Sequence, residues 1–259
     1  MINGISVIMP TYNQASFIRR AILSLQKQIY KNWELIIVND GCTDKTEEYL
    51  SGLLNDSKII YIKNEKNQGL GYALNQGLDK AKYDYIAYLP SDDFYYDNHL
   101  ESLKEKIEQY DNIVLTYSGM KYAVNDTVTY APEYETKRIR SGYCLQLVQT
   151  MHKKTTDRWL ERSEWITEDL FLMFWSKLLD KGAFVATQNI TCFWTDHPFQ
   201  RHKIVAEKYY GGISYYRVYY HVDKPIKIRV SRYKFIDEEY LYKDFQVQVK
   251  PNKQPLKFC

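Results

Sequence analysis

The chain has 259 residues, of which 45% are hydrophobic and 26% are charged, and its formal net charge is +3. This length and apolar content predict one sizeable core with an appendage, so disorder is not the default expectation. The small net charge does not indicate nucleic acid as a partner. The four cysteines are scattered and lack the spacing of a zinc site, which favours a reducing compartment.

The start of the chain gives no sign of a targeting segment. The first apolar run, residues 5–9, is shorter than the core of a signal peptide, and no run of roughly 18 apolar residues occurs. We therefore expect a cytoplasmic protein that is at most peripheral, at the cytoplasmic face of a membrane.

The first 120 residues alternate short apolar runs with amphipathic segments, a pattern typical of parallel strands joined by crossover helices. Apolar runs predict strands at residues 5–9, 35–38, 59–62, 85–89 and 113–117. Helical periodicity predicts helices over residues 18–25, 43–50, 70–81, 98–110 and 169–179, the second of them capped by Thr43 or Asp44. The fold class is therefore α/β.

Two later regions break this pattern. A long polar stretch runs through residue 141, and such stretches are more often functional loops than core elements. From residue 209 onward the chain is aromatic and basic, and alternation at residues 227–230 and 246–249 predicts some β structure. We expect a main domain over residues 1–205 and a C-terminal extension over residues 206–259.

Polar residues follow three of the predicted strands: Thr11, then Asp40, then the adjacent pair Asp92 and Asp93. The carboxyl ends of parallel strands meet at one edge of a sheet, where ligands bind. Each Asp alone is more often a turn former or a helix cap, but the series favours a ligand site. Two adjacent acids repel each other, so the pair indicates a divalent metal and its anionic ligand.

Four segments carry a resemblance to a known family: residues 7–13 (VIMPTYN), 37–44 (IVNDGCTD), 67–69 (NQG) and 91–93 (SDD). In this order and spacing they resemble the inverting glycosyltransferases of family 2, which have the GT-A fold. The likeness is strong over about the first 120 residues and weaker to about residue 200. It implies a Rossmann-like, mostly parallel central sheet, with a nucleotide-sugar half at residues 1–120 and an acceptor-side half at residues 121–205.

The resemblance also implies the donor site. Pro10, Thr11 and Tyr12 resemble positions that line the uridine pocket, and Asp40 resembles the acid that hydrogen-bonds the uracil ring. A carboxylate there accepts an imide N–H, which favours uracil or thymine over purines. Three further positions resemble nucleotide-sugar contacts, and they are Asn67, Gly69 and Ser91.

Asp92 and Asp93 resemble the DxD element that holds Mn²⁺ or Mg²⁺ on the donor's diphosphate, and Asp92 is also expected to contact the nucleotide-sugar. Oxygen ligands and a phosphate-bound ion suit those metals. Pro90 stands where the family often has its first acid, so ligation falls on Asp92 or Asp93. His197 falls where the family often has a histidine near the metal, and the alternative is a structural role. Leu74 replaces an arginine that many relatives carry.

An inverting transfer needs a base on the acceptor side, opposite the leaving diphosphate. Asp169, at the start of the predicted helix over residues 169–179, resembles the family's base. The alternative is that this acid favours the positive end of a helix. His152 resembles a segment of some relatives, although a lone histidine is more often structural.

The sequence therefore predicts a metal-dependent enzyme that moves one sugar from a UDP-sugar, or alternatively a dTDP-sugar, to a hydroxyl of a glycan or lipid-linked acceptor in surface polysaccharide or glycan biosynthesis. A dinucleotide-dependent oxidoreductase is disfavoured, because no G-x-G-x-x-G follows the first strand. A GT-A-like binding module without catalysis remains the other alternative. The basic, aromatic C-terminal extension is either a solvated surface or a face for anionic lipid headgroups.

Overall fold

The computed structural model describes residues 2–124, 127–129, 145–161, 170–196, 227–231 and 234–237. The helical elements are α1 Ala15–Gln26, α2 Thr46–Leu50, α3 Leu70–Lys80, α4 His99–Ile107, the 3₁₀ turn η1 Leu147–Gln149 and α6 Leu170–Leu179. The strands are β1 Ile5–Thr11, β2 Trp33–Asn39, β3 Ile59–Lys63, β4 Tyr85–Tyr88, β5 Phe94–Tyr95, β6 Ile113–Val124, β7 Thr127–Thr129, β8 Thr150–Lys153, β9 Ala183–Asp196, β10 Lys227–Ser231 and β11 Lys234–Asp237.

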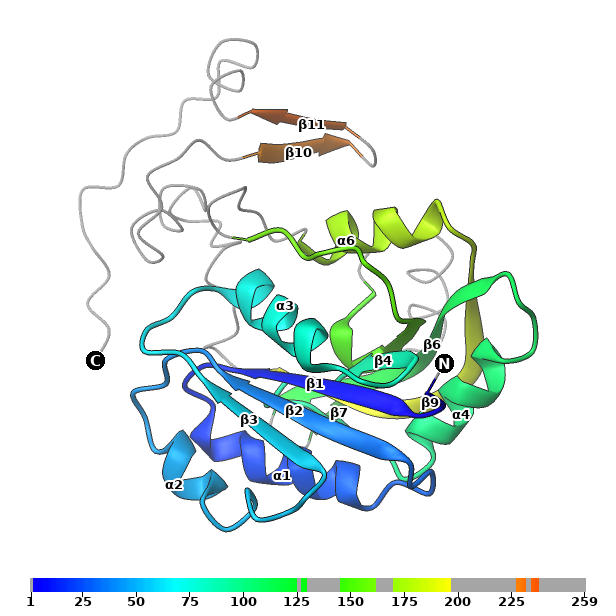
Figure 1. Cartoon of the computed structure of the whole chain (residues 1–259). Helices are drawn as coiled ribbons and strands as arrows, with labels where there is room; N and C mark the ends of the chain where they lie inside the picture. Colours follow the sequence, from blue (N-terminus) through cyan, green and yellow to red (C-terminus); the bar gives the residue numbers. More distant parts are fainter. Residues whose placement is uncertain are drawn as a thin grey trace. The chain divides into compact units, whose positions relative to one another are not determined.

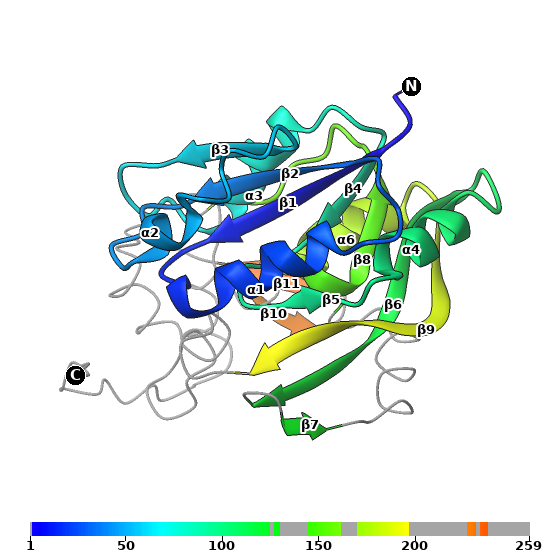
Figure 2. The ribbon, with the colours of Figure 1, turned by 90° about the horizontal axis from the view of Figure 1, so that it is seen from below.

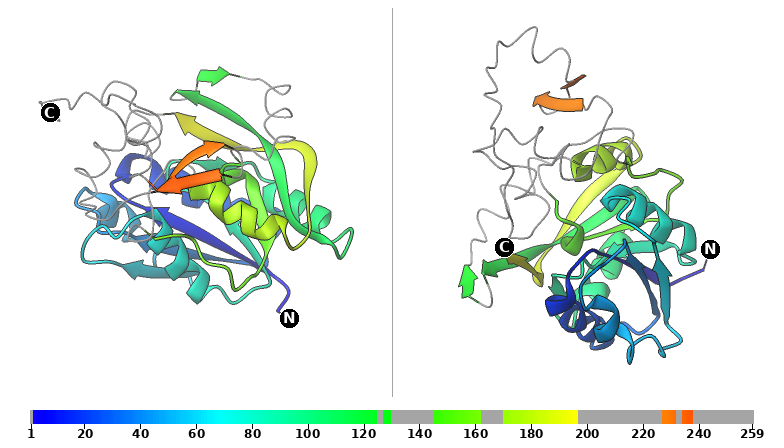
Figure 3. Two further views of the ribbon diagram at one scale, coloured as in Figure 1. Left: turned by 90° about the horizontal axis from the view of Figure 1, so that it is seen from above. Right: turned by 90° about the vertical axis from the view of Figure 1, so that its left-hand side faces the viewer.

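Nine of these strands form one sheet in the order β3-β2-β1-β4-β8-β6-β9-β5, with β7 paired to β6. The first four strands are parallel, as the alternating pattern predicted. The other half is mixed, because β8 runs antiparallel to both β4 and β6 while β9 runs parallel to β6. Figure 3 shows the long strands β6 and β9 side by side. Strands β10 and β11 form a separate antiparallel pair.

Helices cover both faces of the parallel half. Helix α3 lies on one face of β1 and β2, and α1 and α2 lie on the other (Figure 1). Seen from below, α1 runs across β1 (Figure 2). This two-sided cover explains why the central strands read as continuous apolar runs.

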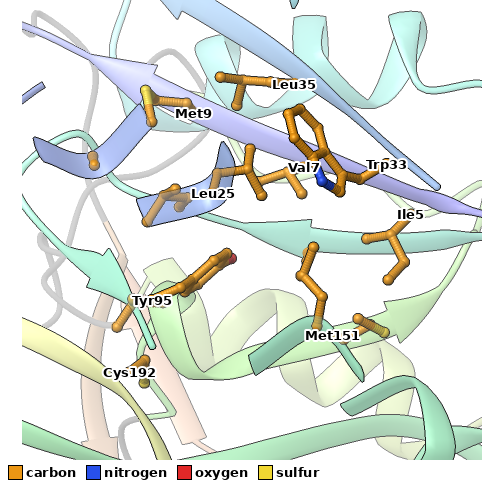
Figure 4. Close-up of a cluster of buried hydrophobic side chains, with 14 of the residues drawn as sticks. Ile5, Val7, Met9, Leu25, Trp33, Leu35, Tyr95, Met151 and Cys192 are labelled. Atoms are coloured by element: carbon orange, nitrogen blue, oxygen red, sulfur yellow. The ribbon is translucent and has the colours of Figure 1, made fainter. Parts of the chain in front are cut away.

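Side chains of β1 alternate between the two faces of the sheet, and every second one lies in the main core cluster. Ile5, Val7 and Met9 face α1, whose side chains at Ile18, Ala21, Ile22 and Leu25 are also fully buried. Figure 4 shows this cluster with Leu35 of β2 and Tyr95 of β5. The helical stripe that the sequence predicted is therefore the core face of α1.

Helix α3 approaches the opposite face of β1 closely. A Cβ atom on Gly77 would lie 2.4 Å from Cγ2 of Ile8, so only glycine fits at this crossing. The glycine therefore lets the later part of α3 pack directly against the middle of β1.

The predicted strands and helices of the first 117 residues are all present, with small shifts at their ends. Helix α2 begins at Thr46, so neither Thr43 nor Asp44 occupies its cap position; Asp44 instead accepts a hydrogen bond from the Thr46 N–H over 3.1 Å. Part of the expected polar loop is the extension of β6 and the strand β7.

Strands β5, β8 and β9 were not predicted. β9 has 14 residues, but Gln188 within it has a φ of 63°, and its register with β6 shifts. Such an irregularity interrupts the alternation by which strands are recognised. β8 is only four residues long and buries two polar side chains, Thr150 and His152.

The chain divides into two compact units. One comprises Met1–Trp159 with Phe171–Asp196, and the other comprises Leu160–Leu170 with His197–Cys259. The expected boundary at residue 205 stays a prediction. Among the described residues, no helix is long and apolar enough to cross a membrane.

Candidate functional site

The carboxyl ends of β1, β2 and β4 lie next to one another at one edge of the sheet. The Asp40 N–H donates to the Thr11 carbonyl over 2.9 Å, and the Leu89 N–H donates to the Ile8 carbonyl over 3.0 Å. These bonds place Thr11 beside Asp40 and bring the turn at residues 90–93 out beside β1. The edge predicted from the three strand ends is therefore present.

The turns after β1 and β2 are bound to each other. Asn13, with a φ of 54°, accepts the Thr43 N–H over 2.8 Å on its Oδ1, and Asp44 Oδ2 accepts the Ala15 N–H over 3.0 Å at the start of α1. Cys42 Sγ accepts the Asn13 N–H over 3.2 Å, and burial raises the pKa of its thiol. The cysteine is therefore a packed thiol within this pair of turns.

Asp40 is buried and its carboxylate is engaged by the chain itself. Oδ1 accepts the Asn64 side-chain amide over 2.8 Å and the Gln68 N–H over 2.9 Å, while Oδ2 accepts the Gly69 N–H over 2.8 Å. The loop between β3 and α3 is thus folded onto Asp40. Among the residues that the structure describes, Oδ2 accepts one hydrogen bond, which leaves capacity for a further donor.

The same loop is held from its other side. Asn64 and Gln76 exchange two amide hydrogen bonds of 2.9 Å, which ties the end of β3 to α3. Gly41, with a φ of 75°, packs so closely that a Cβ atom there would lie 2.6 Å from the Asn67 backbone nitrogen. Asn64 follows β3 as Asp40 follows β2, so the rule of polar residues after strands would have found it.

The other expected nucleotide contacts line this edge. Thr11 is 2% exposed, and its Oγ1 has no hydrogen-bond partner among the described residues. Pro10 and Ser91 are buried, whereas Tyr12 and Asn67 are half-buried. An unpartnered hydroxyl is costly inside a protein unless a ligand or water completes it.

Asp92 and Asp93 have different surroundings. Asp93 is 2% exposed, and its Oδ1 accepts the Thr195 N–H of β9 over 2.9 Å. Burial raises the pKa of the Asp93 carboxyl well above its usual range, and the neighbouring Asp92 charge adds to the effect. Asp92 is only half-buried. The two acids therefore divide into one that faces the protein and one that reaches its surface.

Arg20 of α1 stabilises this turn, and nothing in the sequence pattern predicted that contact. Its Nη2 donates to the Asp92 carbonyl over 2.8 Å and to Thr195 Oγ1 over 2.6 Å. Its guanidinium also lies 4.9 Å from the ring centre of Phe94. The positive charge counters part of the effect of burial on Asp93.

The assignment of a metal ion to Asp92, Asp93 and His197 stays a prediction. Among the described residues, no group of three or more His, Cys, Asp or Glu side chains is placed to hold a metal ion. Magnesium is commonly held by one or two carboxylates together with substrate phosphates and water. The half-buried Asp92 fits that arrangement, and the inward-facing Asp93 does not. His197 and the expected base Asp169 lie outside the described residues.

A second network joins α3 to α6 through Trp159. Asn75 donates its side-chain N–H to the Trp159 carbonyl and accepts the Trp159 N–H, both over 2.9 Å. The indole stacks on Phe174 of α6 with ring centres 4.0 Å apart. Since α6 begins at Leu170, this network fixes the helix that directly follows Asp169 in the chain.

His152 belongs to the core rather than to the ligand edge. It is fully buried, its Nδ1 donates to the Lys153 carbonyl over 2.7 Å, and its Nε2 accepts the Tyr88 hydroxyl over 2.8 Å. Burial lowers the pKa of His152 to about 4, so the ring is neutral. Leu74 is also fully buried, which explains an apolar residue at that position.

Comparison with known sequences gives a family match. The family model described as "Glycosyl transferase family 2" matches residues 6–182. An uncharacterized glycosyltransferase of Rickettsia typhi is 43% identical over 116 residues, which are 44% of this chain and 36% of that protein. Glycosyltransferase GlyA of Streptococcus pneumoniae is 36% identical over 124 residues, 48% of this chain and 17% of that protein. The chain spans less than half the length of these relatives.

Solved structures share the fold. S. aureus TarS 1–349 in complex with UDP-GlcNAc has a TM-score of 0.65 and 20% identity, and covers 77% of this chain and 60% of its own. The mannosyltransferase PcManGT from Pyrobaculum calidifontis, in complex with GDP-Man and Mn²⁺, has a TM-score of 0.63 and 12% identity, and covers 86% of this chain and 66% of its own. At these identities the likeness establishes the architecture alone.

Proposed function

Since the chain belongs to glycosyl transferase family 2, we propose that it transfers one sugar from a UDP-sugar, or alternatively a dTDP-sugar, to a hydroxyl of an acceptor. The family and the α/β fold expected from the sequence are thereby confirmed. The observation that carries the proposal is the convergence of Thr11, Asp40 and the Asp92 turn at the carboxyl ends of adjacent strands.

The donor base is assigned to the end formed by β1 and β2. Among the described residues, the buried Thr11 hydroxyl has no hydrogen-bond partner and Asp40 Oδ2 accepts one bond, which leaves both able to bind a ligand. An imide N–H of uracil or thymine is such a donor. Tyr12, half-buried at the same edge, supplies a ring against which a base can pack.

The donor diphosphate is assigned to the Asp92 turn, with Mn²⁺ or Mg²⁺ held by Asp92 and phosphate oxygens. The ion, when bound, offsets charge on the departing diphosphate. His197 is a further candidate ligand. Asp93 is assigned to holding the turn, because its carboxylate points to Thr195.

Chemistry on the acceptor is assigned to Asp169. A carboxylate opposite the leaving group takes the proton of the acceptor hydroxyl as that oxygen attacks the anomeric carbon, in a single displacement with inversion. The network through Asn75 and Trp159 supports this assignment, because it holds the helix that follows Asp169.

The acceptor is proposed to be a glycan or a lipid-linked glycan of surface polysaccharide biosynthesis, met in the cytoplasm. Contact between the basic, aromatic C-terminal extension and anionic headgroups would bring a lipid-linked acceptor within reach. Vesicle co-sedimentation with and without anionic lipid tests this part.

The proposal is tested by donor binding and turnover. Thermal shift with a panel of nucleotide sugars, with and without Mn²⁺, identifies the donor, since a ligand at about 100 times its Kd adds roughly 2.7 kcal/mol of stability. UDP release is then measured for the parent chain and for Asp92→Asn, with the exposed Asp97→Asn as matched control. We expect Asp92→Asn alone to lose metal-dependent release.

The competing function is a binding module that keeps the fold without catalysis. Pro90, in place of the family's usual first acid, is the feature that favours it. Metal-independent UDP binding, together with no turnover on any donor and acceptor, would support the module and refute the transferase.

A further inference from the structure

We propose that Arg20 is a positioning residue for the Asp92 turn, setting the metal-binding geometry without contacting the nucleotide-sugar. The inference rests on the proposed function, because it assigns Asp92 to a divalent metal. It begins from a contact between segments far apart in the sequence: α1, the turn after β4 and the end of β9 meet at one guanidinium.

The contact uses both hydrogens of a single nitrogen. Arg20 Nη2 donates to the Asp92 carbonyl over 2.8 Å and to Thr195 Oγ1 over 2.6 Å. A planar NH₂ group with two acceptors at these distances fixes the direction of both. These bonds fix the position of the Asp92 backbone relative to β9, and with it the Cα atom from which the Asp92 side chain extends.

Asp93 closes the same arrangement from the other side. Its Oδ1 accepts the Thr195 N–H over 2.9 Å, so Thr195 is held by Arg20 at its hydroxyl and by Asp93 at its backbone. Thr195 is fully buried one residue before the end of β9, and the next residue in the chain after β9 is His197. The hydrogen bonds of Arg20 and Asp93 thus join the turn that carries Asp92, one candidate metal ligand, to β9, after which the other candidate, His197, follows in the chain.

Aromatic rings hold the guanidinium in place. It lies 4.9 Å from the ring centre of Phe94 and 5.6 Å from that of Phe17. Phe94 in turn stacks on Phe193 of β9, with ring centres 4.7 Å apart. A lysine retains the charge but lacks the flat, two-hydrogen donor, so it replaces arginine only in part.

We therefore expect substitution of Arg20 to weaken the affinity for the metal ion while the affinity for the nucleotide stays the same. The test measures the Mn²⁺ dissociation constant at saturating UDP, from the electron paramagnetic resonance signal of free Mn²⁺. It also measures UDP affinity in EDTA by calorimetry. The variants are Arg20→Ala and Arg20→Lys, and Arg19→Ala is the matched control, because Arg19 is the adjacent, exposed arginine of the same helix.

We expect Arg20→Ala to weaken Mn²⁺ binding at least tenfold, Arg20→Lys to fall between it and the parent, and Arg19→Ala to stay within twofold. UDP affinity in EDTA should stay within twofold throughout. If Arg20→Ala does not fold, Thr195→Val carries the test, since it removes the hydroxyl acceptor and keeps the N–H bonded to Asp93.

Unchanged Mn²⁺ affinity in folded Arg20→Ala would overturn the inference. A tenfold loss of UDP affinity in EDTA would also overturn it, because it would mean that Arg20 contacts the nucleotide directly. A parent chain that binds neither UDP nor Mn²⁺ would instead refute the proposed function, and the inference with it.

Discussion

The substitution Asp40→Asn separates a structural role of this carboxylate from a role in reading the base. Asn64 and Gln68 share Oδ1, so an asparagine keeps its carbonyl oxygen there and turns its NH₂ group toward the Gly69 N–H. One hydrogen bond to a charged acceptor is lost, at about 1.5–3 kcal/mol, and the other two become weaker. We therefore expect the variant to lose about 3 kcal/mol of stability, which lowers Tm by roughly 6–12 °C in a domain of this size.

The assay is urea and thermal unfolding of the chain without nucleotide, compared with Asp97→Asn, an identical change at an exposed position. The control should shift Tm by less than about 2 °C, since exposed substitutions without partners change stability little. If Asp40→Asn unfolds like the parent and loses only UDP affinity, the carboxylate serves the base alone, and the role assigned here to the loop bonds is wrong.

Two further outcomes follow from the buried networks. Burial lowers the pKa of His99 to about 3 and of His152 to about 4, below the ordinary value near 6.5. As the pH falls below about 6.5, these rings take up protons in the unfolded chain but stay neutral in the folded one, so the free energy of unfolding decreases until the pH reaches the folded-state pKa values. Between pH 8 and pH 5 each ring should lower the free energy of unfolding by about 2 kcal/mol, whereas the Asp93 carboxyl, whose pKa is raised, changes it in the opposite direction. Urea unfolding at both pH values is therefore compared for the parent chain and for His152→Gln, and an equal pH dependence of the two would contradict the burial of His152 as a neutral ring. Asn75→Ala removes both hydrogen bonds to Trp159 and should lower the free energy of unfolding by about 2–3 kcal/mol. We expect acceptor-dependent kcat to fall more than UDP affinity, because the substitution loosens α6. Equal losses of kcat and of UDP affinity would argue against a role of Asn75 in holding α6.

The parallel half of the sheet was predictable because its signals are local. The apolar runs of β1 and β2 and the stripe of α1 each repeat with the period of the element they form. Thr11 and Asp40 then follow strand ends, and parallel pairing alone brings those ends together. A single sequence therefore contains enough to place this edge.

The remaining parts depend on contacts between distant segments, which no local period records. Arg20 and Thr195 are 175 positions apart, and Asn75 and Trp159 are 84 apart. In the sequence, Arg20 is one more charged residue on an amphipathic helix, and Trp159 stands outside any regular element. Their partners can be identified only from the folded chain, in which β9 pairs with β5 and α6 packs against Trp159.

The adjacent acids illustrate how the structure changes an inference from sequence. Two neighbouring carboxylates suggest two ligands for one cation, but Asp93 is buried against Thr195 while Asp92 reaches the surface. Asp40 behaves like Asp93, since its oxygens hold the backbone of a neighbouring loop. Three N–H donors offset the cost of burial at Asp40, whereas a single N–H donor at Asp93 offsets it only in part, and the pKa of the Asp93 carboxyl is raised. The carboxylates of Asp40 and Asp93 thus hold the loops at this edge of the sheet in fixed positions relative to the strands.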